Sequence, residues 1–212
     1  MISFPQLKQP EGSLYCGGYC VVACLQAFDL LPLTSPILLN RFDRSSKRFV
    51  GTEVAVTDKK DLDAMAIDIY AITGILSEDG APPYVENSGS NSLAATIYVL
   101  NKFGLKTEVV ISNELALSSL KAFVPAEFEL FEQLGAPVVV LNGEPATFPN
   151  SALISVIALP KLLHYVVNND RGEWFDPQIG VYCESWDPIT EWDTDCRKRE
   201  NANWLGISIR VS

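Results

Sequence analysis

The only histidine of the chain opens the stretch His164-Tyr-Val-Val-Asn-Asn-Asp-Arg-Gly-Glu-Trp-Phe-Asp176-Pro-Gln-Ile-Gly180. Residues 163–168 and 173–176 read as two strands, and residues 169–172 between them have the composition of a hairpin turn. Strands joined by a hairpin are adjacent and antiparallel, so Asp176 is expected beside His164 near the open end of the pair. The stretch therefore predicts an imidazole and a carboxylate close together on one sheet.

A second motif, far upstream, is Tyr15-Cys16-Gly17-Gly18, which ends a polar stretch and leads into an apolar helix predicted over 16–29. The unpaired backbone N–H groups and the dipole of a helix N-terminus favour an anion, so this position favours the thiolate form of Cys16. Gly17 and Gly18 leave room for a substrate backbone, and a free N–H of the first turn can stabilise an oxyanion.

These groups are the ones that a cysteine nucleophile requires. Cys16 is expected to attack, His164 to act as general base and then general acid, and Asp176 to orient the imidazole. Gln9, seven residues before Cys16, is a candidate amide donor to the oxyanion. Each residue also has a structural alternative: a core histidine, a tight Cys-Gly turn, an Asp-Pro turn and a surface glutamine. The agreement of chain order, element type and hairpin spacing favours the catalytic interpretation, so the chain is a candidate thiol hydrolase.

The composition is that of an ordinary globular protein. With 48% hydrophobic and 20% charged residues, the 212-residue chain can bury a sizeable core and is expected to form a single domain, 1–212. Within it, residues 1–90 are expected to be a mainly helical subdomain that carries the nucleophile. Residues 91–212 are expected to combine helices with an antiparallel sheet that carries the histidine and the aspartate, which makes the fold class α+β.

Helices are predicted over 16–29, 61–76, 92–103 and 115–134, and strands over 106–111, 138–141, 153–159, 163–168, 173–176 and 203–211. Asp61 is expected to cap the second helix, Gly104 to end the third and Pro125 to break the fourth. The strand at 138–141 is apolar on both faces and is therefore expected inside the sheet. The stretch from the first helix to about residue 60 reads as helical or irregular, and 77–90 reads as a loop at the subdomain seam.

The net charge and the hydropathy pattern limit the partners. The formal charge of −10 leaves no cationic patch to neutralise phosphate, so neither nucleic acid nor an anionic membrane is expected. No apolar run approaches the roughly 18 residues of a membrane-spanning helix, and no leader of basic then apolar residues is visible. We expect a cytoplasmic protein, or one exported without a cleavable signal peptide, and the sequence implies no cofactor.

The five cysteines show neither metal-finger nor disulfide-framework spacing. Cys16, Cys20 and Cys24 share one helical face, where a soft-metal site is conceivable, but Cys20 and Cys24 are interpreted as small buried hydrophobes. The chain ends with a group of tryptophans, Trp186, Trp192 and Trp204. Core anchoring is the favoured interpretation of these residues, and a peptide groove is the alternative.

Four segments together resemble the papain-like cysteine peptidase superfamily: Gln9-x6-Cys16-Gly17, a Gly-Ala-Pro-Val-Val-Val strand, His164-Tyr-Val-Val and Asp176-Pro. The nearest branch includes the bacteriocin-processing double-glycine peptidases. The resemblance covers the N-terminal arm, the first helix and roughly 130–180, and it implies a papain-like fold with a Cys-His-Asp triad and Gln9 at the oxyanion. The interval from Gln9 to Cys16 is one residue longer than in many members, and Gln6 is the less favoured substitute.

Two further resemblances leave the reaction open. Residues 172–180 are also similar to the Asp-Pro-Gln-x-Gly end of papain-fold glutamine deamidase toxins and effectors, and Tyr15-Cys-Gly with Leu25-x-Ala-Phe-x-Leu-x-Pro32 is similar to phytochelatin synthases. All these reactions begin with thiolate attack on an amide and a thioester on the cysteine. The favoured interpretation is a peptidase acting on a peptide or protein. The alternatives are a deamidase, an acyl transferase and a non-catalytic papain-fold binding module.

Overall fold

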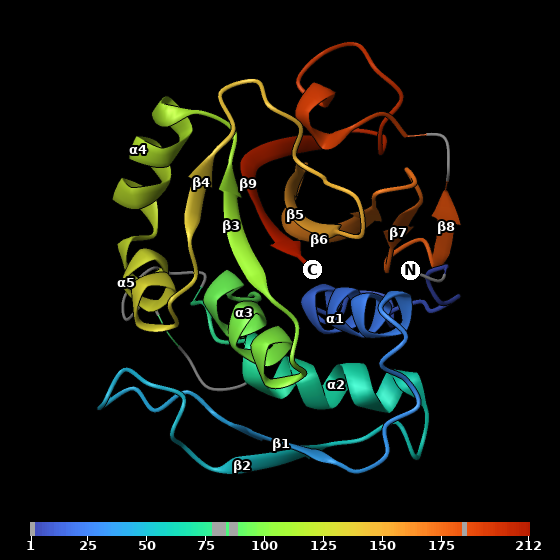
Figure 1. Ribbon diagram of the computed structural model, residues 1–212, viewed down its shortest axis with the longest axis vertical. Coiled ribbons are helices and arrows are strands. Elements are labelled where there is room, and N and C mark those ends of the chain that lie inside the picture. The colour runs from blue at the N-terminus through green and yellow to red at the C-terminus, as the bar shows by residue number, and fades with distance from the viewer. Residues whose placement is uncertain (1–2, 78–83, 85–88, 184–185) are drawn as a thin grey trace.

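The computed structural model describes residues 3–77, 84, 89–183 and 186–212 (Figure 1). The helices are α1 (Cys16–Ala27), α2 (Leu62–Thr73), α3 (Leu93–Lys102), α4 (Glu114–Phe123), α5 (Pro125–Gln133) and the 3-10 turn η1 (Ile189–Glu191). The strands are β1 (Ile37–Asn40), β2 (Glu53–Val56), β3 (Thr107–Ile111), β4 (Val138–Val140), β5 (Ala152–Leu159), β6 (Leu162–Asn169), β7 (Trp174–Asp176), β8 (Val181–Cys183) and β9 (Asn203–Val211). The loop predicted over 77–90 lies mostly outside the described residues.

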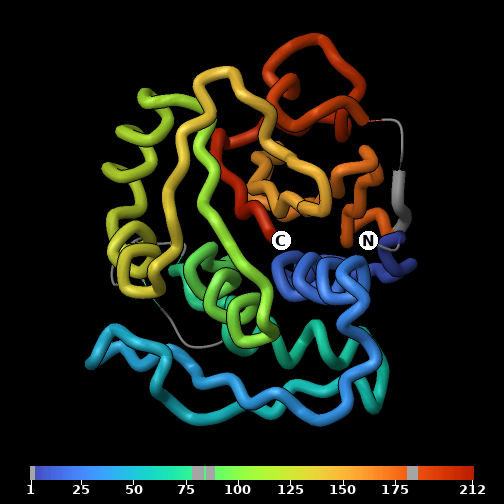
Figure 2. The backbone as a smooth tube through the Cα atoms, in the orientation of Figure 1, coloured from blue at the N-terminus to red at the C-terminus, as the bar shows by residue number. Residues whose placement is uncertain are grey.

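Seven strands form one sheet in the order β4-β3-β9-β5-β6-β7-β8. All neighbours in it pair antiparallel except β3 and β4, which are parallel. The C-terminal strand β9 runs through the middle of the sheet between β3 and β5, and Figure 2 shows it among strands from much earlier in the chain. Helices precede most of the sheet in sequence, so the fold is α+β as expected.

The position of β4 corrects one prediction. The apolar run at 138–141 was expected inside the sheet, but β4 lies at its edge and pairs only with β3. Val138 is 39% exposed, and the strand is only three residues long. A strand at the edge of a sheet leaves backbone N–H and C=O groups unpaired, and a strand of three residues leaves few of them. A short apolar strand can therefore lie at the edge and need not have a neighbouring strand on both sides.

A two-stranded hairpin occupies part of the stretch that reads as helical or irregular in the sequence. Strands β1 and β2 pair antiparallel from Ile37 opposite Val56 to Asn40 opposite Glu53. Each strand has four residues, which is too short for an alternating pattern to stand out against its charged surroundings. In Figure 1 the hairpin, the helices α2 and α3 and the sheet with α1 against it lie in successive layers.

Helix α1 is enclosed by these layers. All of its residues except Gln26 are buried, because α2 packs on one side and β6 on the other. Cys20 and Cys24 have no exposed surface, in agreement with their interpretation as core residues. A Cβ at Gly18 would collide with the backbone carbonyl of Ala66 in α2, so this glycine permits the close crossing of the two helices.

The predicted helix signals at Asp61, Gly104 and Pro125 are confirmed, whereas α1 and α2 end two to three residues earlier than predicted. The side chain of Asp61 accepts a hydrogen bond from the Ala64 N–H at 2.6 Å and so caps α2. Gly104 follows α3 with a φ of 84°, the left-handed conformation that a helix-ending glycine adopts. Helices α4 and α5 are separated at Val124, directly before Pro125.

A second, smaller core contains most of the tryptophans. The rings of Trp174 and Trp192 stack with centroids 5.0 Å apart, and Trp186 packs edge-on against both. Trp204 is also buried, so the core interpretation of this group holds, with Trp186 only partly covered.

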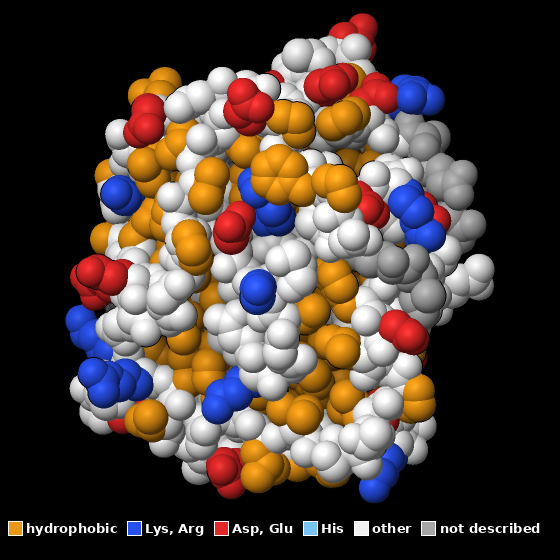
Figure 3. Space-filling view, viewed as in Figure 1, with side chains coloured by type: hydrophobic (Ala, Val, Ile, Leu, Met, Phe, Trp, Pro, Cys, Tyr) orange, Lys and Arg blue, Asp and Glu red, His pale blue; other side chains and the backbone are white. Residues whose placement is uncertain are grey.

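Acidic and basic side chains are interspersed with hydrophobic ones on the face seen in Figure 3, so the net negative charge is not gathered there. Among the described residues, no helix combines the length and apolarity needed to cross a membrane.

Candidate active site

The hairpin of β6 and β7 brings His164 and Asp176 into contact. The strands pair with Val167 opposite Phe175, so one residue further along this register Asp176 comes opposite Val166, two positions from His164. The Nε2 atom of His164 lies 2.8 Å from Oδ1 of Asp176. Both side chains are almost fully buried, with 2% and 1% exposed surface. The predicted adjacency is therefore present, and Nδ1 is the ring nitrogen that is not engaged by Asp176.

Cys16 is the first residue of α1 and faces this imidazole. The thiol lies close enough to the His164 ring to be one of the groups that raise the pKa of the imidazole. Helices α2, α3 and α4 each have a side-chain N-cap, whereas α1 has none and carries no acidic residue in its first turn. The N–H groups and the positive end of the dipole at Cys16 are therefore not taken up by a capping side chain.

The surroundings of His164 favour its charged form. Burial lowers the pKa of the imidazole, but the hydrogen bonds to Asp176 and to Cys16 outweigh burial and raise the pKa to about 9. A ring that is protonated at neutral pH between a carboxylate and a thiol is suited to pair with a thiolate and to donate its proton later.

Asp176 is kept ionised by groups on two sides. Burial raises the pKa of this carboxyl, but the hydrogen bond from His164, the positive charge of Arg199 and the Gln178 N–H lower it below its usual value. Arg199 places Nη1 3.2 Å from Oδ2 of Asp176 and donates from Nη2 to the side chain of Gln178 at 2.7 Å. Arg199 therefore stabilises the aspartate from the side opposite to the imidazole.

Gln9 lies at the start of the same region. Its backbone N–H donates to the carbonyl of Pro177 at 2.8 Å, which ties the N-terminal arm to the turn after Asp176. Its side-chain Nε2 donates to the carbonyl of Ser13 at 2.9 Å, in the loop that leads to Cys16. The side chain is buried, but its amide hydrogen is directed at this loop, and its role at the oxyanion stays a prediction.

A buried asparagine also reaches the thiol. Nδ2 of Asn91 lies 2.7 Å from the carbonyl oxygen of Leu14 and 3.5 Å from Sγ of Cys16. Its Oδ1 accepts a hydrogen bond from the Thr73 hydroxyl at 2.7 Å, and its backbone carbonyl accepts one from the Tyr165 hydroxyl at 2.8 Å. Asn91 thus connects the loop before α1 with the end of α2 and with β6.

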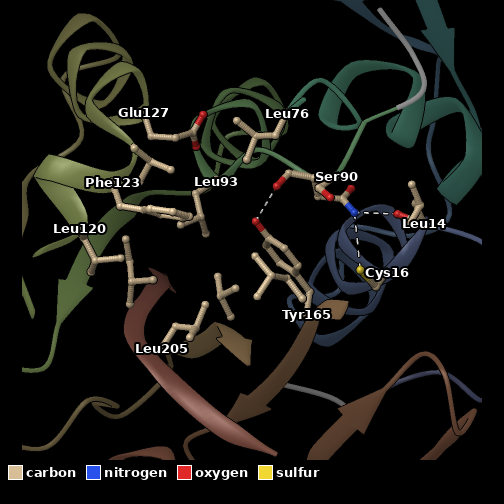
Figure 4. A pocket seen from close by; sticks show the side chains of 15 residues that line it. Leu14, Cys16, Leu76, Ser90, Leu93, Leu120, Phe123, Glu127, Tyr165 and Leu205 are labelled. Carbon is tan, nitrogen blue, oxygen red and sulfur yellow. Dashed lines mark hydrogen bonds between the residues drawn. The ribbon is translucent and has the colours of Figure 1, made fainter. Parts of the chain in front are cut away.

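An apolar pocket of about 90 Å³ begins at the thiol. Ten of its lining side chains are aliphatic or Phe: Leu14, Leu76, Leu93, Leu120, Phe123, Val124, Val156, Leu163, Leu205 and Ile207. In Figure 4 Cys16 lies at one end of the pocket and Leu120 and Phe123 at the other, with Tyr165 between them. A buried carboxyl, Glu127, also lines it but is occupied by hydrogen bonds from Tyr84, Ser92 and the Ala94 N–H. Apart from these polar groups, the space next to the thiol suits a hydrophobic group.

The comparison with known families agrees with this geometry. The model of the family described as "Invasion plasmid antigen J, cysteine protease" matches residues 8–212. The chain belongs to this family. It is a papain-like cysteine protease family, so the chain is a cysteine peptidase by family and its substrate is a protein. No curated protein and no solved structure matches the chain.

Two residues of this candidate site are not apparent in the sequence alone. Asn91 directly precedes Ser92, the serine that caps α3. No sequence motif or characteristic spacing links Asn91 with Cys16. Arg199 belongs to the densest basic stretch of the sequence, Arg197-Lys-Arg199, where a solvated surface is the usual interpretation. Both depend on tertiary contacts between distant segments, which a single sequence does not reveal.

Proposed function

We propose that the protein hydrolyses a peptide amide bond with Cys16 as nucleophile, His164 as general acid and base, and Asp176 as the residue that orients the imidazole. The observation that carries the proposal is the position of the His164 ring between the Asp176 carboxylate and the Cys16 thiol. Membership in a cysteine protease family supports the same reaction.

The proposed reaction has two halves. The Cys16 thiolate attacks the carbonyl carbon of the scissile amide, and the resulting oxyanion is stabilised by N–H groups at the start of α1 and by Gln9. His164 gives its proton to the leaving amine as the C–N bond breaks, which leaves a thioester on Cys16. His164 then takes a proton from a water molecule as that water attacks the thioester, and the carboxylic acid and the thiolate are released.

The pocket supports a preference within this reaction. Because the space that begins at the thiol is lined mainly by leucine, isoleucine, valine and phenylalanine, we propose that a large apolar group of the substrate binds there. Burial of such a group contributes roughly 1.5–3 kcal/mol, which is enough to discriminate it from a small residue by about tenfold or more.

Two neighbouring leucines allow a matched test of this preference. Leu163 lines the pocket at Cys16, whereas Leu162 lines a separate groove beside Arg199, and both side chains are about half exposed. Leu163→Trp should fill the pocket and lower kcat/KM for peptides with a large apolar residue at the cleavage site, and Leu162→Trp should leave it unchanged. Equal effects of the two substitutions would contradict the assignment of the pocket.

The reaction itself is tested by mass spectrometry of candidate proteins and peptides after incubation with the protein. Chain cleavage that is lost in Cys16→Ser supports the proposal. Conversion of a glutamine to glutamate without cleavage would indicate a deamidase, and transfer of the acyl group to an added amine or thiol would indicate an acyl transferase.

Selective alkylation of Cys16 by iodoacetamide gives an independent check, because burial raises the pKa of the Cys20 and Cys24 thiols and keeps them unreactive. Equal, slow alkylation of all cysteines would favour a binding module.

A further inference from the structure

The side chain of Asn91 is held in a single orientation. Its Nδ2 lies 2.7 Å from the Leu14 carbonyl oxygen, which can only accept, so the nitrogen and the oxygen of the carboxamide are distinguished. The Thr73 hydroxyl donates to Oδ1 at 2.7 Å and fixes the other end. Asn91 is only 3% exposed, so its carboxamide is largely shielded from bulk water.

One N–H of this carboxamide is left for the thiol. The Nδ2 group carries two protons, and the Leu14 carbonyl takes one of them. The remaining partner within reach is Sγ of Cys16 at 3.5 Å, a distance at which a sulfur atom accepts a hydrogen bond. A thiolate accepts such a bond more strongly than a thiol, because bonds to charged groups are the stronger ones.

The surrounding residues make room for this contact. A Cβ at Gly17 would collide with Oδ1 of Asn91, so the glycine after the nucleophile is needed for the carboxamide to lie against the start of α1. The Tyr165 hydroxyl donates to the Asn91 carbonyl at 2.8 Å, and Tyr165 directly follows His164 in β6. The strand that supplies the imidazole therefore also holds the backbone of Asn91.

We propose that Asn91 donates a hydrogen bond to the Cys16 thiolate and stabilises it together with His164, with Thr73 as the positioning residue that orients the carboxamide. This inference rests on the proposed function, because it assigns Asn91 to the same nucleophile. Cys16 thus has an imidazolium on one side and an amide donor on the other. The alternative is that Asn91 only fastens the loop at Leu14, in which case the thiolate is independent of it.

The two alternatives differ in the pH dependence of the thiolate. If Asn91 stabilises the thiolate, its loss shifts the acid limb of the alkylation rate to higher pH by roughly one unit, the equivalent of one hydrogen bond to a charged group. The plateau at high pH does not fall, because every thiol is ionised there. Among the described residues, the titratable groups near the sulfur are His164 and Tyr165 on β6, Asp176 on β7 and Cys20 on α1, with Glu127 on α5 lining the same pocket, and none of them is substituted in the variants.

The experiment measures the second-order rate of Cys16 alkylation by iodoacetamide against pH in the full chain. Thr73→Val removes the hydroxyl that orients Asn91 and leaves Asn91 itself in place. Thr107→Val is the matched control, since the Thr107 hydroxyl donates to Oδ1 of Asn101 at 2.9 Å in the same kind of pair on β3. Asn91→Ala removes the donor. We expect the acid limb to move to higher pH in Asn91→Ala, to move less far in Thr73→Val, and to stay in Thr107→Val.

The inference is overturned if the acid limb of the alkylation rate stays in place in both Asn91→Ala and Thr73→Val and only the melting temperature falls. Asn91 is then a structural residue. Should Asn91→Ala fail to fold, Thr73→Val against Thr107→Val decides. The proposed function has a separate signature, because its failure removes fast, His164-dependent alkylation of Cys16 already in the unsubstituted protein. Selective alkylation that His164→Ala slows and Thr73→Val leaves unchanged would contradict the role of Asn91 alone.

Discussion

At the scale of single residues, the charge of His164 is set by two opposing effects. Burial alone lowers the pKa of an imidazole, but here the hydrogen bonds from the ring to Asp176 and Cys16 raise it to about 9. The imidazolium therefore persists through neutral pH and is lost as the pH rises through about 9. A base limb of kcat/KM near this value follows, because the leaving amine then lacks its proton donor.

Asp176→Asn tests this balance. The amide removes the hydrogen bond to a carboxylate that raises the pKa of His164, while the burial that lowers it remains. We expect kcat/KM to fall by roughly 10²-fold and its base limb to move to lower pH, since orientation and protonation of the ring are both weakened. The control is Asp187→Asn, which removes a carboxylate from a surface pair with Arg197. Unchanged kinetics in Asp176→Asn would remove Asp176 from the mechanism.

Arg199 acts on the same pair from a greater distance. Burial raises the pKa of Asp176, and the charge of Arg199 is one of the effects that lower it. In Arg199→Gln the carboxylate should therefore take up a proton at a higher pH, and the acid limb of kcat/KM should move in the same direction. Arg171→Gln breaks an exposed pair with Glu173 and serves as the control. Equal acid limbs in the two variants would show that Asp176 does not depend on Arg199.

At the scale of elements, the position of Cys16 depends on how closely α1 packs against α2. Replacing Gly18 by Ala has two opposing effects: the change adds about 1 kcal/mol of helix propensity, but the new Cβ collides with the Ala66 carbonyl. A backbone carbonyl cannot rotate away as a side chain can, and such overpacking costs about 1–3 kcal/mol. We therefore expect Gly18→Ala to lower the free energy of unfolding in chemical denaturation.

The propensity effect can be measured separately in the same helix. Gln26 is the one residue of α1 that is not buried, so the difference between Gln26→Ala and Gln26→Gly reports helix propensity alone. Subtracting it from the effect of Gly18→Ala gives the cost of the collision. A gain in stability at Gly18 equal to the difference at Gln26 would contradict the close crossing of the two helices.

The sequence predicts the helices and strands that have a clear hydrophobic periodicity and capping or turn residues at their ends. The helix after Asp61, the helix before Gly104 and the strand at 203–211 agree with the structure to within a few residues. Hairpin spacing also predicts the contact of His164 with Asp176. The β1–β2 hairpin is too short for a pattern, and the edge position of β4 depends on how the strands are ordered. Strand order is decided by tertiary packing and cannot be predicted from the hydropathy of a single strand.

At the scale of the whole molecule, the site lies where the helical layer meets the sheet. Cys16 comes from α1, His164 and Asp176 from β6 and β7, and Arg199 from the segment that leads into β9. Helix α1 packs against both β6 and β7. Cys16, His164 and Asp176 are therefore brought together only when both parts of the chain have folded, so the alkylation rate of Cys16 reports the integrity of the whole fold.

The last strand is central to this assembly. β9 pairs with β3 on one side and β5 on the other, and it places Trp204 in the smaller core and Ile207, Ile209 and Val211 in the larger one. Each of these buried side chains contributes about 1.5–3 kcal/mol, so together they approach the net stability of about 5–15 kcal/mol of a typical domain.

A chain that ends at residue 202 lacks β9, so circular dichroism should show it to be unfolded and the fast alkylation of Cys16 should be lost. A chain that ends at residue 211 loses only the backbone hydrogen bonds between Ser212 and Lys106 and should keep the fold with a slightly lower Tm. A folded, selectively alkylated protein without β9 would contradict the strand order of the sheet.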